Sequence, residues 1–83
     1  MTPQMTTNDI EIIQVNISGD DKPGLTTCLT DILARYDAMI LDIGQANIHK
    51  SLTLAILFRT EKKNSGFIMK ELLFKASEMG EMI

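Results

Sequence analysis

The hydrophobic residues between positions 10 and 79 follow two different periods, and the order in which these periods alternate restricts the possible folds. Apolar residues alternate with polar ones over much of residues 10–18, 39–48 and 52–59, which is the period of a β-strand. Over residues 25–36 and 66–79 they recur every third or fourth position, as on one face of a helix. The sequence therefore predicts the order strand, helix, strand, strand, helix. This order is typical of the α+β, ferredoxin-like fold βαββαβ, in which two helices cover one face of an antiparallel sheet.

Each of the two predicted helices has a continuous apolar face. Asp37 interrupts the first pattern, and Gly80 follows the second, where a glycine commonly ends a helix. The charged residues 60–65 are predicted to form a loop before the second helix. The side of that helix with Lys70, Glu71, Lys75 and Glu78 is predicted to face water. The residues predicted to face the core are Leu25, Cys28, Leu29, Ile32, Leu33 and Tyr36 in the first helix, and Ile68, Met69, Leu72, Leu73, Ala76 and Met79 in the second.

The predicted strands contain irregularities. Ile10 and Ile12 are out of phase with the apolar residues that follow them, so we expect the beginning of the first strand either to form a bulge or to lie outside the regular ladder. Gly44, in the middle of residues 39–48, predicts a bulge or the close approach of another backbone. Residues 52–59 carry apolar side chains in both phases, which predicts a central strand that is covered on both faces.

The second predicted helix leaves only residues 80–83 before the sequence ends. The ferredoxin-like fold has a fourth strand beside the first, at the edge of the sheet. We expect this fourth strand to be largely missing. Residues 10–83 are then one domain truncated before its last strand, and residues 1–9 are a polar, frayed lead.

Composition excludes several classes of function. A chain of 83 residues with 45% hydrophobic residues is expected to be one small globular domain. Its net charge of −3 argues against a nucleic-acid partner, and no apolar run approaches the ~18 residues of a membrane span. The single cysteine, Cys28, excludes an intramolecular disulfide and fits the reducing cytoplasm.

The turn between the first strand and the first helix, Gly19–Leu25, has the composition of an anion-binding loop. Free N–H groups at the start of a helix can hold a carboxylate or a phosphate, and an aspartate of the turn can receive an ammonium group. The alternative is that the aspartates cap the helix and the glycines only form the turn. The candidate ligand-binding residues here are Asp20, Asp21, Lys22, Pro23, Gly24 and Leu25.

No residue pattern indicates catalysis or a metal site. His49 is the only histidine and is predicted to lie in a polar turn, whereas Cys28 is predicted to be a small core residue. A metal site needs several ligands at suitable spacing, and we predict none. Because no nucleophile or base lies beside the Gly19–Leu25 turn, the chain is predicted to sense a small anion rather than to transform it.

Three stretches of the sequence resemble a known family. They are the turn Asp21–Leu25, the segment Ile40–His49 followed by Leu52–Leu54, and the segment Lys70–Ala76. The turn is similar to that of ACT domains in general, and the other two segments are similar to the N-terminal ACT domain of bacterial phosphoserine phosphatases. The resemblance implies that residues 10–83 are an ACT domain that binds an amino acid, with L-serine as the first candidate. It also implies a second wall of the ligand site on the strand 39–48, formed by Asp42, Ile43, Gly44 and Gln45. The alternative is that Asp42 and Gln45 belong to the polar face of an edge strand and bind no ligand.

The resemblance further implies a larger parent enzyme of serine biosynthesis. In that family a haloacid-dehalogenase-type phosphatase domain follows, with an Asp-x-Asp-x-Thr motif and Mg²⁺ as cofactor. Asp20 and Asp21 do not match this motif, so we expect neither catalysis nor a cofactor here, and Mg²⁺ only in the absent catalytic domain. The expected partners are a small-molecule amino acid and a second copy in a homodimer, or another ACT or catalytic domain. The alternatives are a free-standing ACT regulator and a purely dimerising structural domain.

Overall fold

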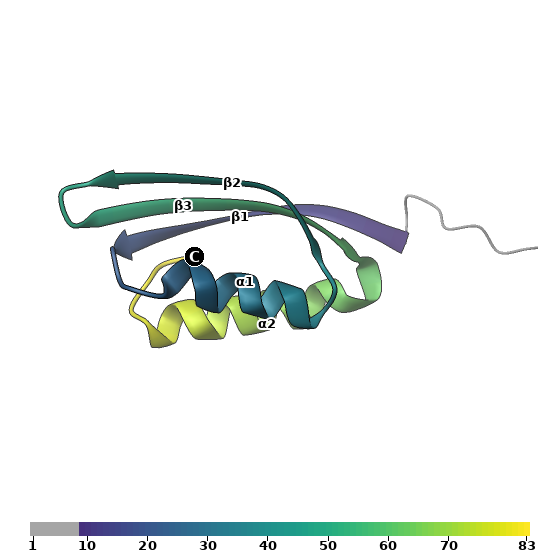
Figure 1. Cartoon of the computed structure of the whole chain (residues 1–83). Helices are drawn as coiled ribbons and strands as arrows, with labels where there is room; N and C mark the ends of the chain where they lie inside the picture. Colours follow the sequence, from purple (N-terminus) through teal and green to yellow (C-terminus); the bar gives the residue numbers. More distant parts are fainter. Residues whose placement is uncertain (1–8) are drawn as a thin grey trace, which may run out of the picture.

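The computed structural model describes residues 9–83, which form five elements in the predicted order (Figure 1). The predicted lead over residues 1–9 lies outside the described residues, apart from its last position. The elements are β1 (Ile10–Asp20), α1 (Leu25–Arg35), β2 (Met39–Ile48), β3 (Ser51–Glu61) and α2 (Lys62–Glu78).

The three strands form one antiparallel sheet in the order β1-β3-β2. Figure 1 shows α1 and α2 on the same side of this sheet, and the two helices are in contact. The arrangement confirms the predicted α+β, ferredoxin-like fold. It also means that, in the part of the chain that the structure describes, β3 has a neighbour on both sides whereas β2 is an edge strand.

The hydrophobic core lies between β3 and the two helices. Alternate residues of β3 from Leu52 to Phe58 are at most 2% exposed, because β3 is flanked by two strands and covered by the helices. Burial of each such side chain stabilises the fold by about 1.5–3 kcal/mol. The buried apolar residues are Val15 and Ile17 of β1, Leu52, Leu54, Ile56 and Phe58 of β3, Leu25, Leu29, Ile32 and Leu33 of α1, and Ile68, Leu72 and Ala76 of α2.

The bulges predicted at the start of β1 and at Gly44 are wrong. β1 pairs with β3 without a shift from Ile10 to Asp20, and Gly44 lies directly opposite Ala55. The register shift occurs instead in β2, between Ile40 and Asp42. The extra residue there places Ile40 opposite Phe58 and Ile43 opposite Ile56, so that both isoleucines share the helix-facing side. In a regular strand, two residues that are three positions apart lie on opposite faces of the sheet.

The prediction that β3 is covered on both faces is also wrong. Both helices lie on one side, and on the other side the described residues form an open face. Ala55 and Leu57 are half-buried there, and Arg59 is exposed. Adjacent strands shield these side chains, which explains how apolar residues are tolerated without a covering layer.

Two predictions for α2 are corrected by the structure. The loop expected at 60–65 is absent: β3 continues to Glu61 and α2 begins at Lys62. The Ser65 hydroxyl donates to the Lys62 carbonyl at 2.9 Å, within the first helical turn. Leu73, predicted to face the core, is 55% exposed, because the buried line of α2 runs through Ile68, Leu72 and Ala76 instead.

The last residues of the chain reach the free edge of β1. Met82 and Ser18 form an antiparallel bridge in which each N–H donates to the carbonyl of the other residue at 2.8 Å. This is the edge at which the ferredoxin-like topology has its fourth strand. In the described residues this bridge is all that is present of the fourth strand, as predicted.

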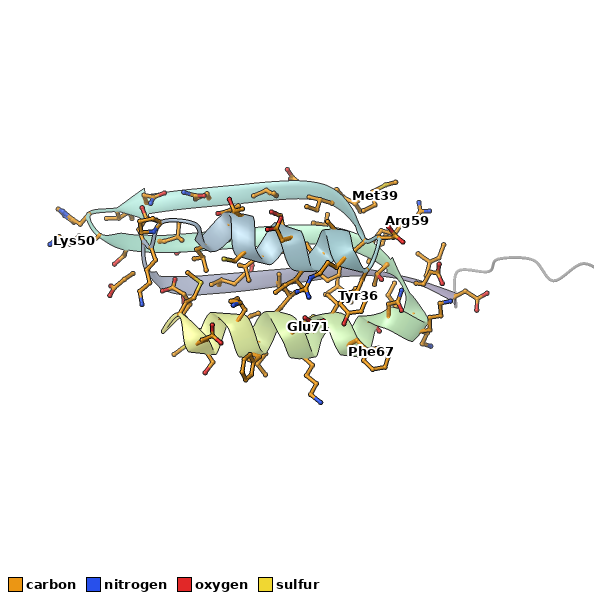
Figure 2. The ribbon with its side chains drawn as sticks, turned by 60° about the horizontal axis from the view of Figure 1, so that its bottom comes forward. Tyr36, Met39, Lys50, Arg59, Phe67 and Glu71 are labelled. Atoms are coloured by element: carbon orange, nitrogen blue, oxygen red, sulfur yellow. The ribbon has the colours of Figure 1, made fainter. Side chains whose placement is uncertain are left out.

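Tyr36, the only tyrosine, links the two helices and provides a direct test of their packing. Its hydroxyl donates to Glu71 of α2, which also pairs with Arg35 at 3.0 Å (Figure 2). The hydrogen bond to the Glu71 carboxylate raises the pKa of Tyr36 above 10.0, with desolvation adding to the effect. Because the neutral phenol is favoured in the folded state, its stabilising contribution is present below pH 10.0 and is lost as the pH rises through the raised pKa.

We therefore expect phenolate absorbance of the folded domain to appear at a higher pH than in the unfolded chain. In the variant Glu71→Gln, the pKa of Tyr36 should move back toward 10.0. Spectrophotometric titration measures both values. An unchanged midpoint in the variant would show that this contact between the helices does not form in solution.

Candidate functional site

The turn between β1 and α1 is attached to the hairpin of β2 and β3. The Asp21 N–H donates to the Lys50 carbonyl at 2.9 Å, and its side chain accepts a hydrogen bond from the Asn47 Nδ2 at 2.7 Å. Asp20 is the last residue of β1, where it lies opposite Ser51 and is exposed. The two predicted aspartates therefore differ: Asp21 is oriented by β2, whereas Asp20 belongs to the open face of the sheet.

The N-terminus of α1 has no side-chain cap. Its N-cap residue is Gly24, in a left-handed conformation with φ 82° and ψ 0°. The Leu25 N–H donates to the Lys22 carbonyl at 3.3 Å, while in the described part of the chain the N–H groups of Thr26 and Thr27 have no partner. The aspartate caps considered as an alternative are thus not formed. Two unpaired N–H groups at the positive end of a helix dipole can receive an anion.

The remaining predicted residues of the turn have structural positions. The Lys22 ammonium donates to the Met79 carbonyl at the C-terminal end of α2, where a cation is favoured by the helix dipole. Leu25 is buried in the core, and Pro23 and Gly24 are exposed. Lys22 therefore links the turn to the end of α2 through a hydrogen bond and is not directed at the unpaired N–H groups of α1.

The second predicted wall, on β2, is divided between the two faces of the sheet. Ile43 and Gln45 lie opposite Ile56 and Leu54, so they share the helix-facing side with the turn. Asp42 and Gly44 lie opposite Leu57 and Ala55, on the open face.

Sequence reasoning missed Asn47, which joins the two walls. The Gln45 Nε2 donates to the Asn47 Oδ1 at 2.9 Å, and Asn47 in turn donates to Asp21. The three side chains form a hydrogen-bonded series from β2 to the turn. The signal in the sequence is that Asn47 is in the same strand phase as Gln45.

β2 has no covering layer on either face in the described structure. Each of its ten residues is exposed, including the apolar Ile40, Leu41 and Ile43 at 37–44%. An edge strand with exposed apolar side chains and unpaired backbone groups is suited to pairing with another chain. The space between the start of α1 and β2 is therefore open on one side.

A buried carboxylate lies at the opposite side of the turn. Glu81 is 7% exposed, and within residues 9–83 neither of its carboxylate oxygens has a hydrogen-bond partner. Gly19 makes room for it, because a Cβ at Gly19 would lie 2.7 Å from the Glu81 Oε2. Among the described residues no ion pair joins Glu81 to Lys22. No pattern in the sequence indicates that this carboxylate is enclosed.

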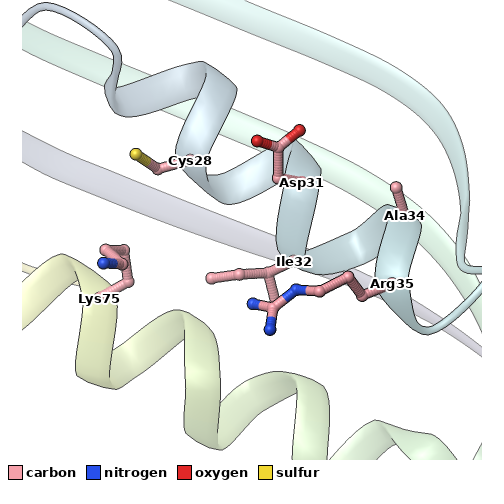
Figure 3. A pocket seen from close by; sticks show the side chains of 6 residues that line it. All are labelled: Cys28, Asp31, Ile32, Ala34, Arg35 and Lys75. Carbon is pink, nitrogen blue, oxygen red and sulfur yellow. The ribbon is translucent and has the colours of Figure 1, made fainter.

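A groove of about 610 Å³ runs between the two helices, away from the turn (Figure 3). Figure 3 shows Ile32 and Arg35 of α1 and Lys75 of α2 lining it. Cys28, predicted to be a core residue, is partly exposed at its edge. Arg35 and Lys75 are already paired with Glu71 and Glu78, at 3.0 and 3.1 Å.

Residues 9–83 bring together no group of three histidine, cysteine, aspartate or glutamate side chains that could hold a metal ion. No helix in the same residues has the length and apolar character needed to cross a membrane. His49 occupies the turn between β2 and β3 with φ 56°. The site is thus built from backbone N–H groups, amides and one carboxylate.

Comparisons with solved structures show the same fold in other proteins. The crystal structure of a "putative glycine cleavage system transcriptional repressor" has a TM-score of 0.82 at 18% identity, covering 88% of this chain and 43% of that one. The crystal structure of an unknown protein from Galdieria sulphuraria has a TM-score of 0.79 at 15% identity, covering 98% and 51%. This chain therefore spans about half the length of both.

A third structure is that of an isolated module. The solution NMR structure of the ACT domain from the GTP pyrophosphokinase of Chlorobium tepidum has a TM-score of 0.56 at 20% identity, covering 76% of this chain and 73% of that one. No curated protein matches the chain in sequence. The model of the ACT domain family matches residues 11–83, which is nearly the whole chain. The chain therefore belongs to the family of ACT domains, which are small-molecule regulatory domains.

Proposed function

We propose that this ACT domain binds a free amino acid, with L-serine as the first candidate, between the start of α1 and the helix-facing side of β2. The observation that carries the proposal is the uncapped N-terminus of α1 beside the series formed by Gln45, Asn47 and Asp21. The N–H groups of Thr26 and Thr27 hold the ligand carboxylate, because the helix dipole favours negative charge there. The Asp21 carboxylate receives the ligand ammonium group. Asp20, Asp42 and Gly44 lie on the other face and make no direct contact in this proposal.

A second ACT domain completes the site by pairing along β2. The support for this step is the exposure of all ten β2 residues, which leaves one side of the site open. Pairing at β2 would cover the apolar residues of the strand and satisfy its unpaired backbone groups. The second domain is another copy of this chain in a homodimer, or a second ACT domain of a longer protein.

The output of the domain is proposed to be regulation of a phosphoserine phosphatase domain in serine biosynthesis, in the cytoplasm. The support is the resemblance of the segment Ile40–His49 and of the segment Lys70–Ala76 to that enzyme's N-terminal ACT domain. Regulation then follows if the ligand binds two arrangements of the domains with different affinity. Mg²⁺ and the catalytic residues belong to the phosphatase domain and not to this chain.

A free-standing ACT regulator is the second candidate. It is favoured by the structural similarity to a protein described as a putative glycine cleavage system transcriptional repressor, of which this chain covers 43%. Such a regulator has no phosphatase domain. Its ligand specificity separates it from the first candidate, because glycine then replaces L-serine as the expected ligand.

Isothermal titration calorimetry of the full chain with a panel of amino acids tests the proposal. We expect L-serine to bind with a Kd of about 10 µM to 1 mM, and L-serine methyl ester, which lacks the carboxylate, not to bind. Tighter binding of glycine than of L-serine would favour the free-standing regulator. The absence of binding by every amino acid would contradict the proposal and favour a purely dimerising domain.

A further inference from the structure

The side of α2 that faces away from the core carries two aromatic rings. Phe67 is 61% exposed and Phe74 is 68% exposed. They are seven residues apart, which is two helical turns, so they lie on one line along the helix. Lys63 and Lys70 belong to the same line, and Figure 2 shows Phe67 directed away from the sheet. Part of the side predicted to face water is therefore an apolar surface without a partner in the described structure.

Several charges near the ends of α2 oppose the dipole of the helix itself. Lys62 and Lys63 occupy its first turn, which holds no acidic residue, and Glu78 is its last residue, whereas Lys75 in the last turn has the favourable sign. Cations near the N-terminus and anions near the C-terminus of a helix are destabilising. A second helix of the same sequence, running antiparallel, would place its acidic end beside this basic end.

We propose that α2 packs antiparallel against α2 of a second copy of this chain, about a two-fold axis between Lys70 and Glu71. Residues equally distant from that axis then face each other. Lys63 meets Glu78 of the second copy, Phe67 meets Phe74, and Lys70 meets Glu71. All three facing pairs are complementary, and each occurs twice because the interface is self-complementary. This surface is distinct from β2, and the inference does not depend on the proposed ligand.

A groove beside Phe74 gives the opposing ring a place to pack. The groove has a volume of about 340 Å³ and lies between α1 and α2. In the proposed dimer the Phe67 ring of the second copy enters it, which buries both rings. The residues that line the groove are Ile32, Arg35, Lys70, Glu71, Phe74 and Lys75.

The existing ion pairs of Lys63 and Glu78 do not prevent their new contacts. Lys63 pairs with Glu61 at 3.3 Å and Glu78 pairs with Lys75 at 3.1 Å, but all four side chains are at least 35% exposed. Exposed pairs of this kind contribute little to stability. The 17 residues of α2 extend over about 25 Å, so the interface is small. We therefore expect a dissociation constant of about 10–500 µM, in the range of transient interfaces.

Sedimentation equilibrium of the full chain between about 10 µM and 1 mM tests the proposal. The wild type should show a concentration-dependent self-association through α2 that Lys63→Glu and Glu78→Lys each weaken about tenfold, since each places like charges opposite each other. The double variant exchanges the two charges and should restore the dimer to within about twofold. Arg59→Glu, an equal change of charge on the exposed open face, is the control and should have no effect.

Three results would overturn the proposal. They are a monomeric wild type at the highest concentration, dimerisation that is insensitive to Lys63→Glu, and a double variant as weak as the single ones. Circular dichroism of each variant confirms that it is folded. Because the substitutions lie on α2, amino-acid binding between α1 and β2 should be unaffected, so a failure of this inference and a failure of the proposed function are distinguishable.

Discussion

The variant Glu81→Leu is expected to stabilise the domain by about 2 kcal/mol. For a domain of 83 residues this corresponds to a rise in Tm of about 8–16 °C. The reason is that Glu81 is only 7% exposed and that neither of its carboxylate oxygens has a partner among the described residues. An enclosed polar group without hydrogen bonds opposes folding, whereas an apolar side chain in the same place favours it.

The local backbone is compatible with this replacement. Gly19 has no Cβ, which leaves room for the side chain at position 81. The adjoining bridge between Ser18 and Met82 uses only backbone groups, which the replacement leaves in place. The variant therefore changes the burial of one charge and little else.

Chemical denaturation and thermal melting of the purified chain measure the change. Glu81→Gln, which removes the charge but keeps polar atoms buried, should lie between the wild type and the leucine variant. The exposed Glu78 is the matched control, and Glu78→Gln should change the free energy of unfolding by less than about 0.5 kcal/mol. A destabilised leucine variant would mean that Glu81 has a binding partner in solution.

The variant Thr26→Pro is expected to lower the affinity for L-serine by about 10- to 100-fold. Proline removes a single N–H group, and in the first helical turn that group has no partner within the helix. If the group holds the ligand carboxylate, its loss removes a hydrogen bond to a charged acceptor, worth about 1.5–3 kcal/mol. A change of about 1.4 kcal/mol in the binding free energy corresponds to a tenfold change in affinity.

Thr26→Ala is the matched control for the proline variant. It removes the side chain of Thr26 but keeps the N–H group, so its affinity should remain within about twofold of the wild type. Thermal melting of both variants shows whether the domain is folded at the temperature of the titration. Equal losses in the two variants would indicate that the threonine side chain binds the ligand, and not the backbone of α1.

The order of helices and strands could be predicted because it depends on short-range periodicity. The buried residues of α1, for example, repeat with helical spacing and were assigned correctly. The bulge in β2 could not be predicted, because it depends on the opposing residues: Ile40 and Ile43 both face the core side only in register with Phe58 and Ile56. Register across a sheet is a long-range property that one strand does not specify.

The candidate site was predicted only in part for a similar reason. The composition of the Gly19–Leu25 turn indicated unpaired N–H groups at the start of a helix, and the structure has two of them in the described residues. The sequence did not show that Lys22 would be used at the end of α2, or that Asn47 would bond to Asp21. These contacts join segments that are 57 and 26 residues apart.

The outward side of α2 shows a further limit of sequence patterns. Helical spacing did not reveal Phe67 and Phe74 as an exposed apolar surface, because they alternate with charged residues along the outward side of the helix. An apolar residue on a polar face increases the total hydrophobicity of a helix while weakening its periodicity. The apolar surface formed by the two rings is identified only from their exposure to solvent in the structure.

The most direct test of amino-acid binding at the start of α1 is an NMR titration of the ¹⁵N-labelled chain with L-serine. We predict that the backbone amide signals of Thr26 and Thr27 move most, followed by the side-chain amides of Gln45 and Asn47. The amide of Gly66, in the first half of α2, serves as an internal reference and should not move. Shifts centred on the groove between α1 and α2, or no shift at a saturating concentration of L-serine, would contradict the account.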